Sequence, residues 1–320
     1  MDKCTATAHT NIALIKYWGK ADAALNLPTT SSLSMTLDKF YTTTSVSFDE
    51  NLSADSLVLN GAAADSGRVQ QFLEIFRLQF GNFPSVLIGS ENHVPTAAGL
   101  ASSASSFAAL TAAMNGLLGL ELSLQDLSRL ARRGSGSATR SIFGNFAIWH
   151  KGTDDTSSFA ESFLNEDIGL SMIVAEVSSG SKKISSSFGM QRAQTSPDYA
   201  AWIKQSAADL TDIEKAILSR DIEKIGAISE NNALAMHALN RSAREPFDYF
   251  TDKTRALIAF VQDCRKQGLL AFVTIDAGPN VKIITDKNTE EKLLAELQQH
   301  FPELTFDIAH AGAGISYADD

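Results

Sequence analysis

Three helical patterns follow Pro197 with no strand between them, and this run restricts the folds open to the chain. In the first, Trp202, Leu210 and Ile217 share one face of a helix, and the other two cover about 221–239 and 252–267. A strict alternation of strand and helix would have separated them with strands. The grouping therefore favours an α+β fold.

The remaining segments mix strand patterns with further helices, and Asn60-Gly61 is a hairpin-type turn signal. Strands are predicted at 42–48, 56–60, 85–89, 146–150, 170–177, 269–275, 281–285 and 305–310. Helices are predicted at 69–80, 104–118, from Ser123 onward, and at 289–300. The Ser-rich stretch 178–189 is predicted to be a polar loop. We expect two domains, 1–177 and 178–320, with the boundary near 178.

Charge and cysteine content exclude several classes of protein. The 320 residues carry 27 Lys and Arg against 37 Asp and Glu, a net charge of −10, which argues against nucleic-acid binding. Two cysteines cannot build a disulfide framework. The apolar stretches, such as 168–177, are too short to span a bilayer, so we expect a cytoplasmic protein without membrane partners. An anionic ligand would need a few locally placed cations.

The segment 95–107, PTAAGLASSASSF, joins a predicted strand to an Ala-rich helix. Glycine lets the backbone approach a ligand, and the free N–H groups of a helix start attract phosphate. Ser102, Ser103 and Ser105 add hydroxyls that can reach phosphate oxygens or Mg²⁺. Neither a Walker A loop nor a G-x-G-x-x-G pattern is present. A phosphate loop and a serine-capped helix start are thus equally open.

The segment 11–20, NIALIKYWGK, places Lys16 and Lys20 on either side of Tyr17 and Trp18. Cations beside aromatic rings fit an anion pocket with an apolar wall. An edge strand followed by a surface turn explains the same pattern more simply, and the residues alone favour that interpretation.

The segment 132–140, RRGSGSATR, contains arginines in two settings. Arg132 and Arg133 suit the C-terminal end of a helix, where cations complement the dipole. Arg140 follows a turn of small residues, and its guanidinium could bind a carboxylate or phosphate through two nitrogens. A flexible loop with Arg140 paired to a surface acid is an equally good interpretation.

In the segment 274–280, TIDAGPN, Asp276 directly follows an apolar strand. A carboxylate fixed at a strand end suits a general base or a metal ligand. A turn-stabilising aspartate accounts for the pattern equally well.

Taken in order, NIALIKYWGK, PTAAGLASSAS, ARRGSGSATRSIFG and TIDAGPNVK resemble the motifs of the diphosphomevalonate decarboxylases of the GHMP kinase superfamily. The resemblance implies a ribosomal protein S5 domain 2-like N-terminal part and a ferredoxin-like C-terminal part, with the active site between them. It implies ATP- and Mg²⁺-dependent conversion of (R)-5-diphosphomevalonate to isopentenyl diphosphate, CO₂, ADP and phosphate, through phosphorylation of the 3-hydroxyl. It also suggests a homodimer whose partners are these small molecules.

The resemblance assigns roles position by position. It implies a catalytic Asp276 with Arg140 and Lys20 beside it. The implied substrate-binding residues are Tyr17, Trp18, Gly19, Lys20, Arg68, Ser135, Gly136, Ser137, Ala138, Thr139, Arg140, Lys182, Ser186 and Met190. The implied nucleotide-binding residues are Pro95, Ala98, Gly99, Leu100, Ala101, Ser102, Ser103 and Ser105, with Ser103 as the Mg²⁺ ligand.

Some positions depart from the pattern of the family. Thr139 stands in place of a usual Cys, Asn145 in place of a usual Gly, and Ser187-Phe188 in place of a more polar pair. These changes affect loop packing and substrate fit and leave the charged groups in place. Two alternatives stay open: a related kinase that phosphorylates without decarboxylating, and a catalytically silent nucleotide-binding protein.

Overall fold

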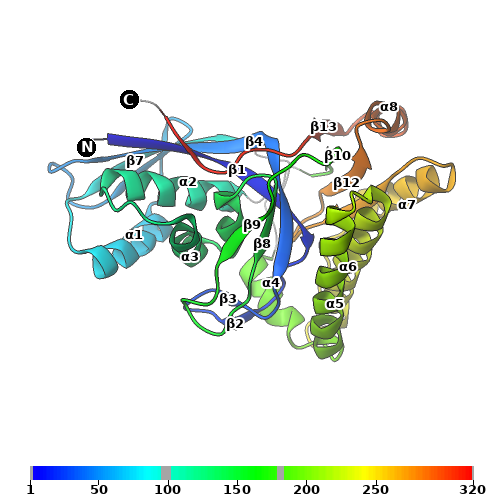
Figure 1. The fold of residues 1–320 in the computed structure, drawn as a ribbon, viewed down its shortest axis with the longest axis horizontal. Helices are drawn as coiled ribbons and strands as arrows, with labels where there is room; N and C mark the ends of the chain where they lie inside the picture. The colour runs from blue at the N-terminus through cyan, green and yellow to red at the C-terminus, as the bar shows by residue number, and fades with distance from the viewer. Residues whose placement is uncertain (1–2, 95–101, 179–183, 319–320) are drawn as a thin grey trace.

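The computed structural model describes residues 3–94, 102–178 and 184–318, and these ranges contain two main sheets and a short hairpin (Figure 1). The first sheet has the order β14-β1-β4-β7-β5-β6, with β8 on β4 and β9 on β8. Its strands are β1 (Lys3–Ile15), β4 (Ser32–Phe48), β5 (Ser56–Leu59), β6 (Ala62–Ala64), β7 (Val86–His93), β8 (Phe146–Trp149), β9 (Ala160–Leu164) and β14 (Ser316–Tyr317). The hairpin pairs β2 (Lys20–Asp22) with β3 (Leu27–Pro28).

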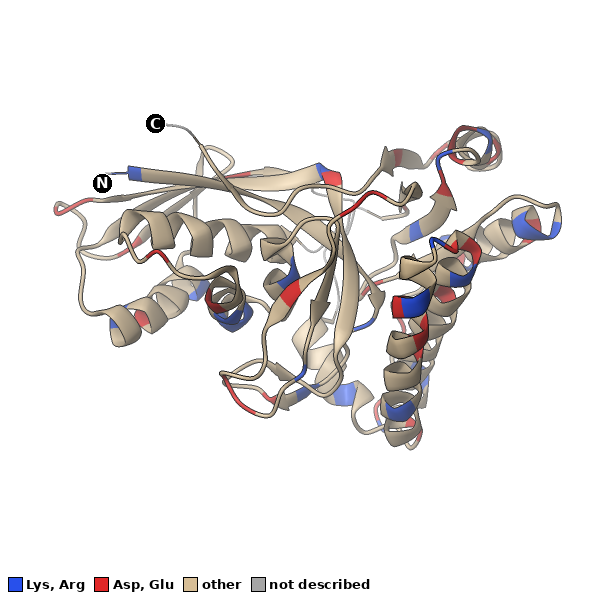
Figure 2. Ribbon diagram, in the orientation of Figure 1, with Lys and Arg blue, Asp and Glu red and all other residues tan. Residues whose placement is uncertain are grey.

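Helices of the first half cover one face of the first sheet. They are α1 (Gly67–Phe80), α2 (Ser102–Leu117) and α3 (Leu124–Gly134), followed by a 3-10 helix (Gly136–Ile142). The central helix α2 lies on β1 and β4, and it is uncharged along its length (Figure 2). Its buried Ala108 and Ala112 have small side chains, which let the helix approach the sheet closely.

The second sheet has the order β11-β12-β10-β13 and is antiparallel throughout. Its strands are β10 (Leu170–Glu176), β11 (Phe272–Ile275), β12 (Val281–Asp286) and β13 (Thr305–Ala309). The helices of this half are α4 (Ser186–Ala193), α5 (Tyr199–Leu218), α6 (Ile222–Ser242), α7 (Asp252–Lys266) and α8 (Glu290–His300). One face of the sheet packs on α7 and α8.

A shared hydrophobic core joins the two halves. Ile12 and Met35 of the first sheet pack in one cluster with Met172 and Ile284 of the second sheet. Ile217 of α5 belongs to the same cluster. Since this core is continuous, it holds the facing ends of β1, β11 and β12 in a fixed arrangement, which is where the candidate site lies.

The predicted α+β fold class is confirmed, and the three helices after Pro197 are α5, α6 and α7. Asn60 and Gly61 have φ values of 51° and 78°, as the predicted hairpin turn between β5 and β6 requires. Ser123 caps α3 by accepting a hydrogen bond from the Asp126 backbone N–H.

One feature differs from the prediction. The stretch 178–189, expected to be a loop, contains the start of α4 with Ser185 as its cap. The strand expected within 11–20 is the end of β1, where Asn11 to Ile15 pair with β4, while β14 covers Ala6 and Thr7. Of the two predicted domains, 1–177 contains β10, which pairs with β12 and β13 of 178–320.

The last described strand returns to the first half. In β14, Ser316 pairs with Thr7 and Tyr317 with Ala6. Before it, the glycine at 314 lies so close to Gly144 that a Cβ on Gly144 would be 2.7 Å from its backbone nitrogen. Within the described residues, no helix is both long and apolar enough to cross a membrane.

Candidate active site

A cavity of about 480 Å³ lies where the two halves meet. Both halves supply its walls, β1 and the 3-10 helix from the first and α4 and the end of β11 from the second. The predicted site residues that line it are Tyr17, Trp18, Lys20, Arg68, Ser103, Ser135, Gly136, Ser137, Arg140, Ser186, Met190 and Asp276.

Asp276 lies between two buried lysines just after β11. Its carboxylate is 2.7 Å from the Lys16 ammonium and 3.4 Å from that of Lys282. Burial alone would raise the pKa of this carboxyl, but the two ammonium groups hold the pKa well below its usual range. The carboxylate thus stays ionised at neutral pH, as a hydrogen-bond acceptor needs to be.

Lys16 directly follows β1 and is only 2% exposed. Burial lowers its pKa, and contact with Asp276 partly opposes that shift. Its ammonium also donates to the Ala13 carbonyl at 2.9 Å, so two of its protons have fixed acceptors.

Arg140 faces the cavity from the 3-10 helix. One guanidinium nitrogen donates to the Ser32 hydroxyl at 2.5 Å, and the group lies 5.8 Å from the centre of the Trp149 ring. Burial lowers the Arg140 pKa to about 10, so the side chain is still cationic at neutral pH. Its side chain lines the cavity, so guanidinium N–H groups that face the cavity can donate to an anionic ligand there.

The turn before Arg140 exposes small groups to the cavity. Gly136 must be glycine, because a Cβ there would lie 2.6 Å from the Tyr17 ring. Ser135 and Ser137 line the cavity. Ala138 and Thr139 are fully buried beneath it, and the Thr139 hydroxyl donates to the Gly136 carbonyl at 2.7 Å. The structure thus places the last two in the support of the turn rather than on its surface.

Lys20 and Arg68 form a positive corner of the cavity. The Lys20 ammonium lies 3.2 Å from the Ser187 hydroxyl in the first turn of α4. Burial, followed by the nearby charge of Arg68, lowers the Lys20 pKa. Arg68 donates to the Gly134 carbonyl at 3.1 Å. Two cations that repel each other in this way favour an anion between them.

The predicted nucleotide-binding segment is described in part. The Ser103 hydroxyl lines the cavity and lies 3.2 Å from that of Ser135. Ser102 begins α2, whereas Ser105 is fully buried and bonded to the Thr42 hydroxyl at 2.8 Å. Pro95, Ala98, Gly99, Leu100, Ala101 and Lys182 lie outside the described residues.

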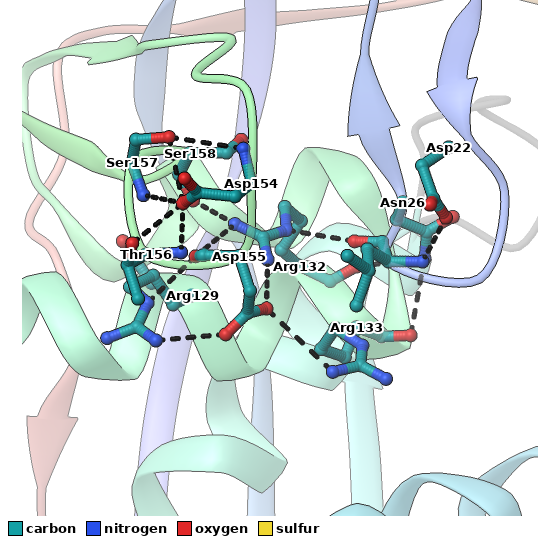
Figure 3. Close-up of polar contacts among 12 residues, drawn as sticks. Asp22, Asn26, Arg129, Arg132, Arg133, Asp154, Asp155, Thr156, Ser157 and Ser158 are labelled. Atoms are coloured by element: carbon teal, nitrogen blue, oxygen red, sulfur yellow. Dashed lines mark hydrogen bonds and ion pairs between the residues drawn. The ribbon is translucent and has the colours of Figure 1, made fainter.

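Arg132 and Arg133 lie in the last turn of α3, as predicted, and they form ion pairs and hydrogen bonds that stabilise the fold (Figure 3). The Asp155 carboxylate contacts Arg132 at 2.5 Å and Arg133 at 3.8 Å, and it binds Arg129 as well. The Asn26 amide donates to the carbonyls of Arg132 and Arg133, which caps the helix. This network fixes the end of α3, from which the Ser135 turn leads directly to Arg140.

Sequence reasoning places Lys16 beside a possible anion pocket but favours an edge strand and leaves this lysine out of the implied site residues. It misses Lys282, which lies in the apolar strand VKIIT. A lysine inside an otherwise apolar strand is itself a signal, because a buried ammonium needs a partner. Asp276, just before that strand, is the partner.

The α+β fold, with a carboxylate held among cations in a cavity where its two halves meet, matches solved structures of the GHMP-kinase-like fold with TM-scores of 0.95 and 0.86. Two family models match the chain: a diphosphomevalonate decarboxylase-like N-terminal domain at residues 8–160, and a mevalonate 5-diphosphate decarboxylase C-terminal domain at 172–314. The chain therefore belongs to the diphosphomevalonate decarboxylase family.

Individual relatives match over nearly the whole chain. The diphosphomevalonate decarboxylase of Candida albicans is 37% identical over 322 residues, 94% of this chain and 89% of the relative. The mevalonate diphosphate decarboxylase from Enterococcus faecalis is 44% identical, with a TM-score of 0.94 and 99% of each chain covered. A structure of MDDEF in complex with MVAPP, AMPPCP and magnesium is 45% identical, with a TM-score of 0.95 and 99% of each chain covered.

Proposed function

We propose that the protein converts (R)-5-diphosphomevalonate and ATP to isopentenyl diphosphate, CO₂, ADP and phosphate. One observation carries this proposal: the ionised Asp276 shares its cavity with Arg140 and with the Lys20–Arg68 corner. The substrate has a hydroxyl, a carboxylate and a diphosphate, and each of these groups has a complementary partner in the cavity.

The reaction needs a leaving group β to the carboxylate. Hydroxide leaves poorly, whereas a phosphate transferred from ATP to the 3-hydroxyl leaves readily. Departure of that phosphate builds positive charge at C3, and loss of CO₂ supplies the electron pair of the alkene.

Asp276 orients the 3-hydroxyl for this transfer. A carboxylate whose pKa lies well below the usual range is a weak base, so it accepts a hydrogen bond rather than removing the proton early. Phosphoryl transfer passes through a loose transition state, in which the attacking hydroxyl keeps its proton until late. Lys16 fixes the Asp276 oxygen at 2.7 Å and thereby fixes the direction of attack.

Arg140 holds the substrate carboxylate so that the breaking C–C bond aligns with the charge that develops at C3. Ser32 restrains one nitrogen of its guanidinium, and the part of the group that lines the cavity is left for the ligand. If Arg140 bound the carboxylate too tightly, it would stabilise the substrate and raise the barrier to decarboxylation, because only interactions that strengthen in the transition state accelerate the reaction.

The diphosphate lies between Lys20 and Arg68, with the hydroxyls and N–H groups at Ser186 and along Ser135–Ser137. We also propose that Lys182, Tyr17 and Met190 contact the substrate. Charge-assisted hydrogen bonds of this kind are about twice as strong as neutral ones.

The donor set suits Mg²⁺ bound together with a nucleotide. Within the part of the chain that the structure describes, no three His, Cys, Asp or Glu side chains converge on a metal site. Mg²⁺ commonly binds through phosphate oxygens and water with few protein ligands. Ser103, which belongs to the proposed nucleotide-binding segment 95–105, would provide one protein oxygen through its hydroxyl. When bound, Mg²⁺ neutralises charge on the transferred phosphoryl group.

A CO₂-release assay tests the proposal, with mevalonate, its 5-phosphate and its 5-diphosphate each supplied with ATP and Mg²⁺. We expect CO₂ and ADP in equal amounts with the 5-diphosphate, and no CO₂ with the other two. ADP without CO₂ would identify a kinase. No turnover of any substrate would indicate a silent nucleotide-binding protein.

The family resemblance also leads us to propose a cytoplasmic homodimer that binds no nucleic acid. Light scattering coupled to size-exclusion chromatography tests the dimer, and a monomer at micromolar concentration would contradict it. Fractionation of the source cells tests the location.

A further inference from the structure

Lys20 begins β2, directly after a short turn of the first half that side chains of the second half hold in place. The Tyr199 hydroxyl donates to the Trp18 carbonyl at 3.0 Å, and the Gln194 amide donates to the Lys20 carbonyl at 3.0 Å. The indole N–H of Trp18 donates to the Asn240 side chain at 2.9 Å. The backbone that leads to Lys20 therefore takes its position from elements far away in sequence.

Tyr199 is placed at the tightest point of this turn. Its hydroxyl is also 2.7 Å from the Thr29 hydroxyl, and the Thr29 N–H donates to the Gly19 carbonyl at 3.2 Å. Gly19 has a φ of +135°, and a Cβ there would lie 1.7 Å from the Tyr199 oxygen. The turn and the hydroxyl thus fit together with no spare room, since only glycine permits the contact.

Helix α4 contacts both ends of Lys20. Gln194, just past the C-terminal end of α4, binds the Lys20 carbonyl, while Ser187 in the first turn lies 3.2 Å from the ammonium. Neither Tyr199 nor Gln194 lines the cavity. Any effect of these two side chains on the substrate must therefore pass through the turn.

We propose that Tyr199 and Gln194 are positioning residues that set where the Lys20 ammonium meets the substrate diphosphate. This inference rests on the proposed function, and specifically on the role of Lys20 as a diphosphate ligand. A lysine side chain has a long flexible stem, so it binds one anion well only if its backbone is fixed. The two contacts supply that restraint from outside the cavity.

Tyr199→Phe is the smallest test, because it removes one oxygen atom and keeps the ring. The Trp18 carbonyl loses its donor and the turn can relax, so we expect the KM for diphosphomevalonate to rise about five- to tenfold, the effect of one buried hydrogen bond. The KM for ATP should stay within about twofold. A matched control is Tyr317→Phe, which loses a 3.0 Å contact with Asn115 that lies far from the cavity, and it should leave both KM values unchanged.

A double-mutant cycle with Lys20→Met separates positioning from general stability. The measurement is the inhibition constant of inorganic pyrophosphate against the diphosphate substrate. If Tyr199 acts through the ammonium, Tyr199→Phe weakens pyrophosphate binding in the wild-type background and changes it less than twofold in the Lys20→Met background. Equal effects in both backgrounds, or none in either, would overturn the proposal.

Gln194→Met keeps the test decisive if Tyr199→Phe does not fold. Gln194 is only partly buried, and it should show the same rise in KM for the diphosphate substrate and the same dependence on Lys20. An unchanged KM in this variant would also refute the inference. An inactive wild-type enzyme, by contrast, would refute the proposed function itself.

Discussion

Asp276→Asn removes the carboxylate that Lys16 and Lys282 both contact, while it keeps the size and shape of the side chain. The two lysines are 2% and 1% exposed, and Arg140 is close enough to lower the Lys16 pKa. In the variant these buried cations would repel one another with no carboxylate between them. We therefore expect a large loss of stability as well as a loss of turnover.

The distances set the size of the effect. Two unit charges 4 Å apart interact by about 4 kcal/mol at an effective dielectric constant of 20, and the two lysines lie 2.7 and 3.4 Å from Asp276. The asparagine variant avoids the cost of burying a carboxylate, which offsets part of the loss. Breaking a buried ion pair costs about 3–5 kcal/mol in measured cases, and we expect the free energy of unfolding to fall by about this amount at pH 7.

The free energy of unfolding of the variant should change with pH in a definite direction. In the variant, Lys16 loses the neighbour that raises its pKa, so its pKa in the folded state falls further below that of the unfolded chain. The unfolded chain then binds more protons across this window, and the stability of the variant rises with pH up to about 10. The difference in free energy of unfolding between the variant and the wild type should accordingly become smaller between pH 7 and pH 9.5. This difference should also become smaller in acid, because the wild type loses the stabilisation from ionised Asp276 as the pH falls toward the lowered pKa of that carboxyl.

Urea unfolding at pH 7 and pH 9.5, followed by tryptophan fluorescence, measures both effects. Asp307→Asn is the control, because its partner Lys39 is 48% exposed and an exposed pair contributes less than about 1 kcal/mol. Turnover of Asp276→Asn should fall by roughly 10²–10⁴ with ATP affinity within a few-fold. A variant within about 1 kcal/mol of wild type at pH 7, or a difference that does not narrow at pH 9.5, would refute the electrostatic argument.

Three further predictions concern other parts of the site. Arg140→Ala should lower kcat/KM for the diphosphate substrate by roughly 10²–10³ in steady-state assays, and an effect confined to the KM for ATP would contradict its role. Ser103→Ala should raise the Mg²⁺ concentration needed for half-maximal rate several-fold, and an unchanged Mg²⁺ titration would exclude it as a ligand. Asp155→Asn leaves the fully buried Arg132 without its anion, and because Asp155 itself is 37% exposed, urea unfolding should show a loss of about 1–3 kcal/mol, whereas loss of activity at full stability would contradict a structural role.

Local patterns in the sequence predicted the helices better than the strands, since only 42–48 of β4 (Ser32–Phe48) was expected and β9 (Ala160–Leu164) was not. Helical periodicity identified α5 to α7, and Asn60-Gly61 predicted a turn that needs two positive φ values. These signals depend on residues that are close together in the sequence, so they can be detected without knowledge of tertiary contacts. The segment at 178–189 was harder, because its serines suit a loop as well as a helix cap, and the capping contact of Ser185 decides the matter.

Prediction of the site depended more on contacts between residues that are far apart in the sequence. Short motifs single out Asp276 and Arg140 as candidates, since their neighbours include the small residues that turns require. Lys16 stays outside the predicted site residues because its contact with Asp276 joins segments 260 residues apart. Lys282 is missed although a lysine in an otherwise apolar strand just after Asp276 is a local signal. Tyr199 and Gln194 were out of reach for the same reason as Lys16: nothing near them in sequence indicates a contact with Trp18 or Lys20.

The pairing of β14 with β1 has a consequence for how the chain is made. One edge of β1 is covered by Ser316 and Tyr317, which the ribosome adds some three hundred residues after Thr7 and Ala6. Until those residues emerge, that edge of β1 offers open backbone groups to other nascent chains. The first sheet is thus completed by a segment that lies about three hundred residues later in the sequence, and in Figure 1 the red trace that leads to β14 runs beside the blue β1. Removal of Ser316 and Tyr317 would keep the residues that line the cavity but would expose this part of the β1 edge to pairing with other chains.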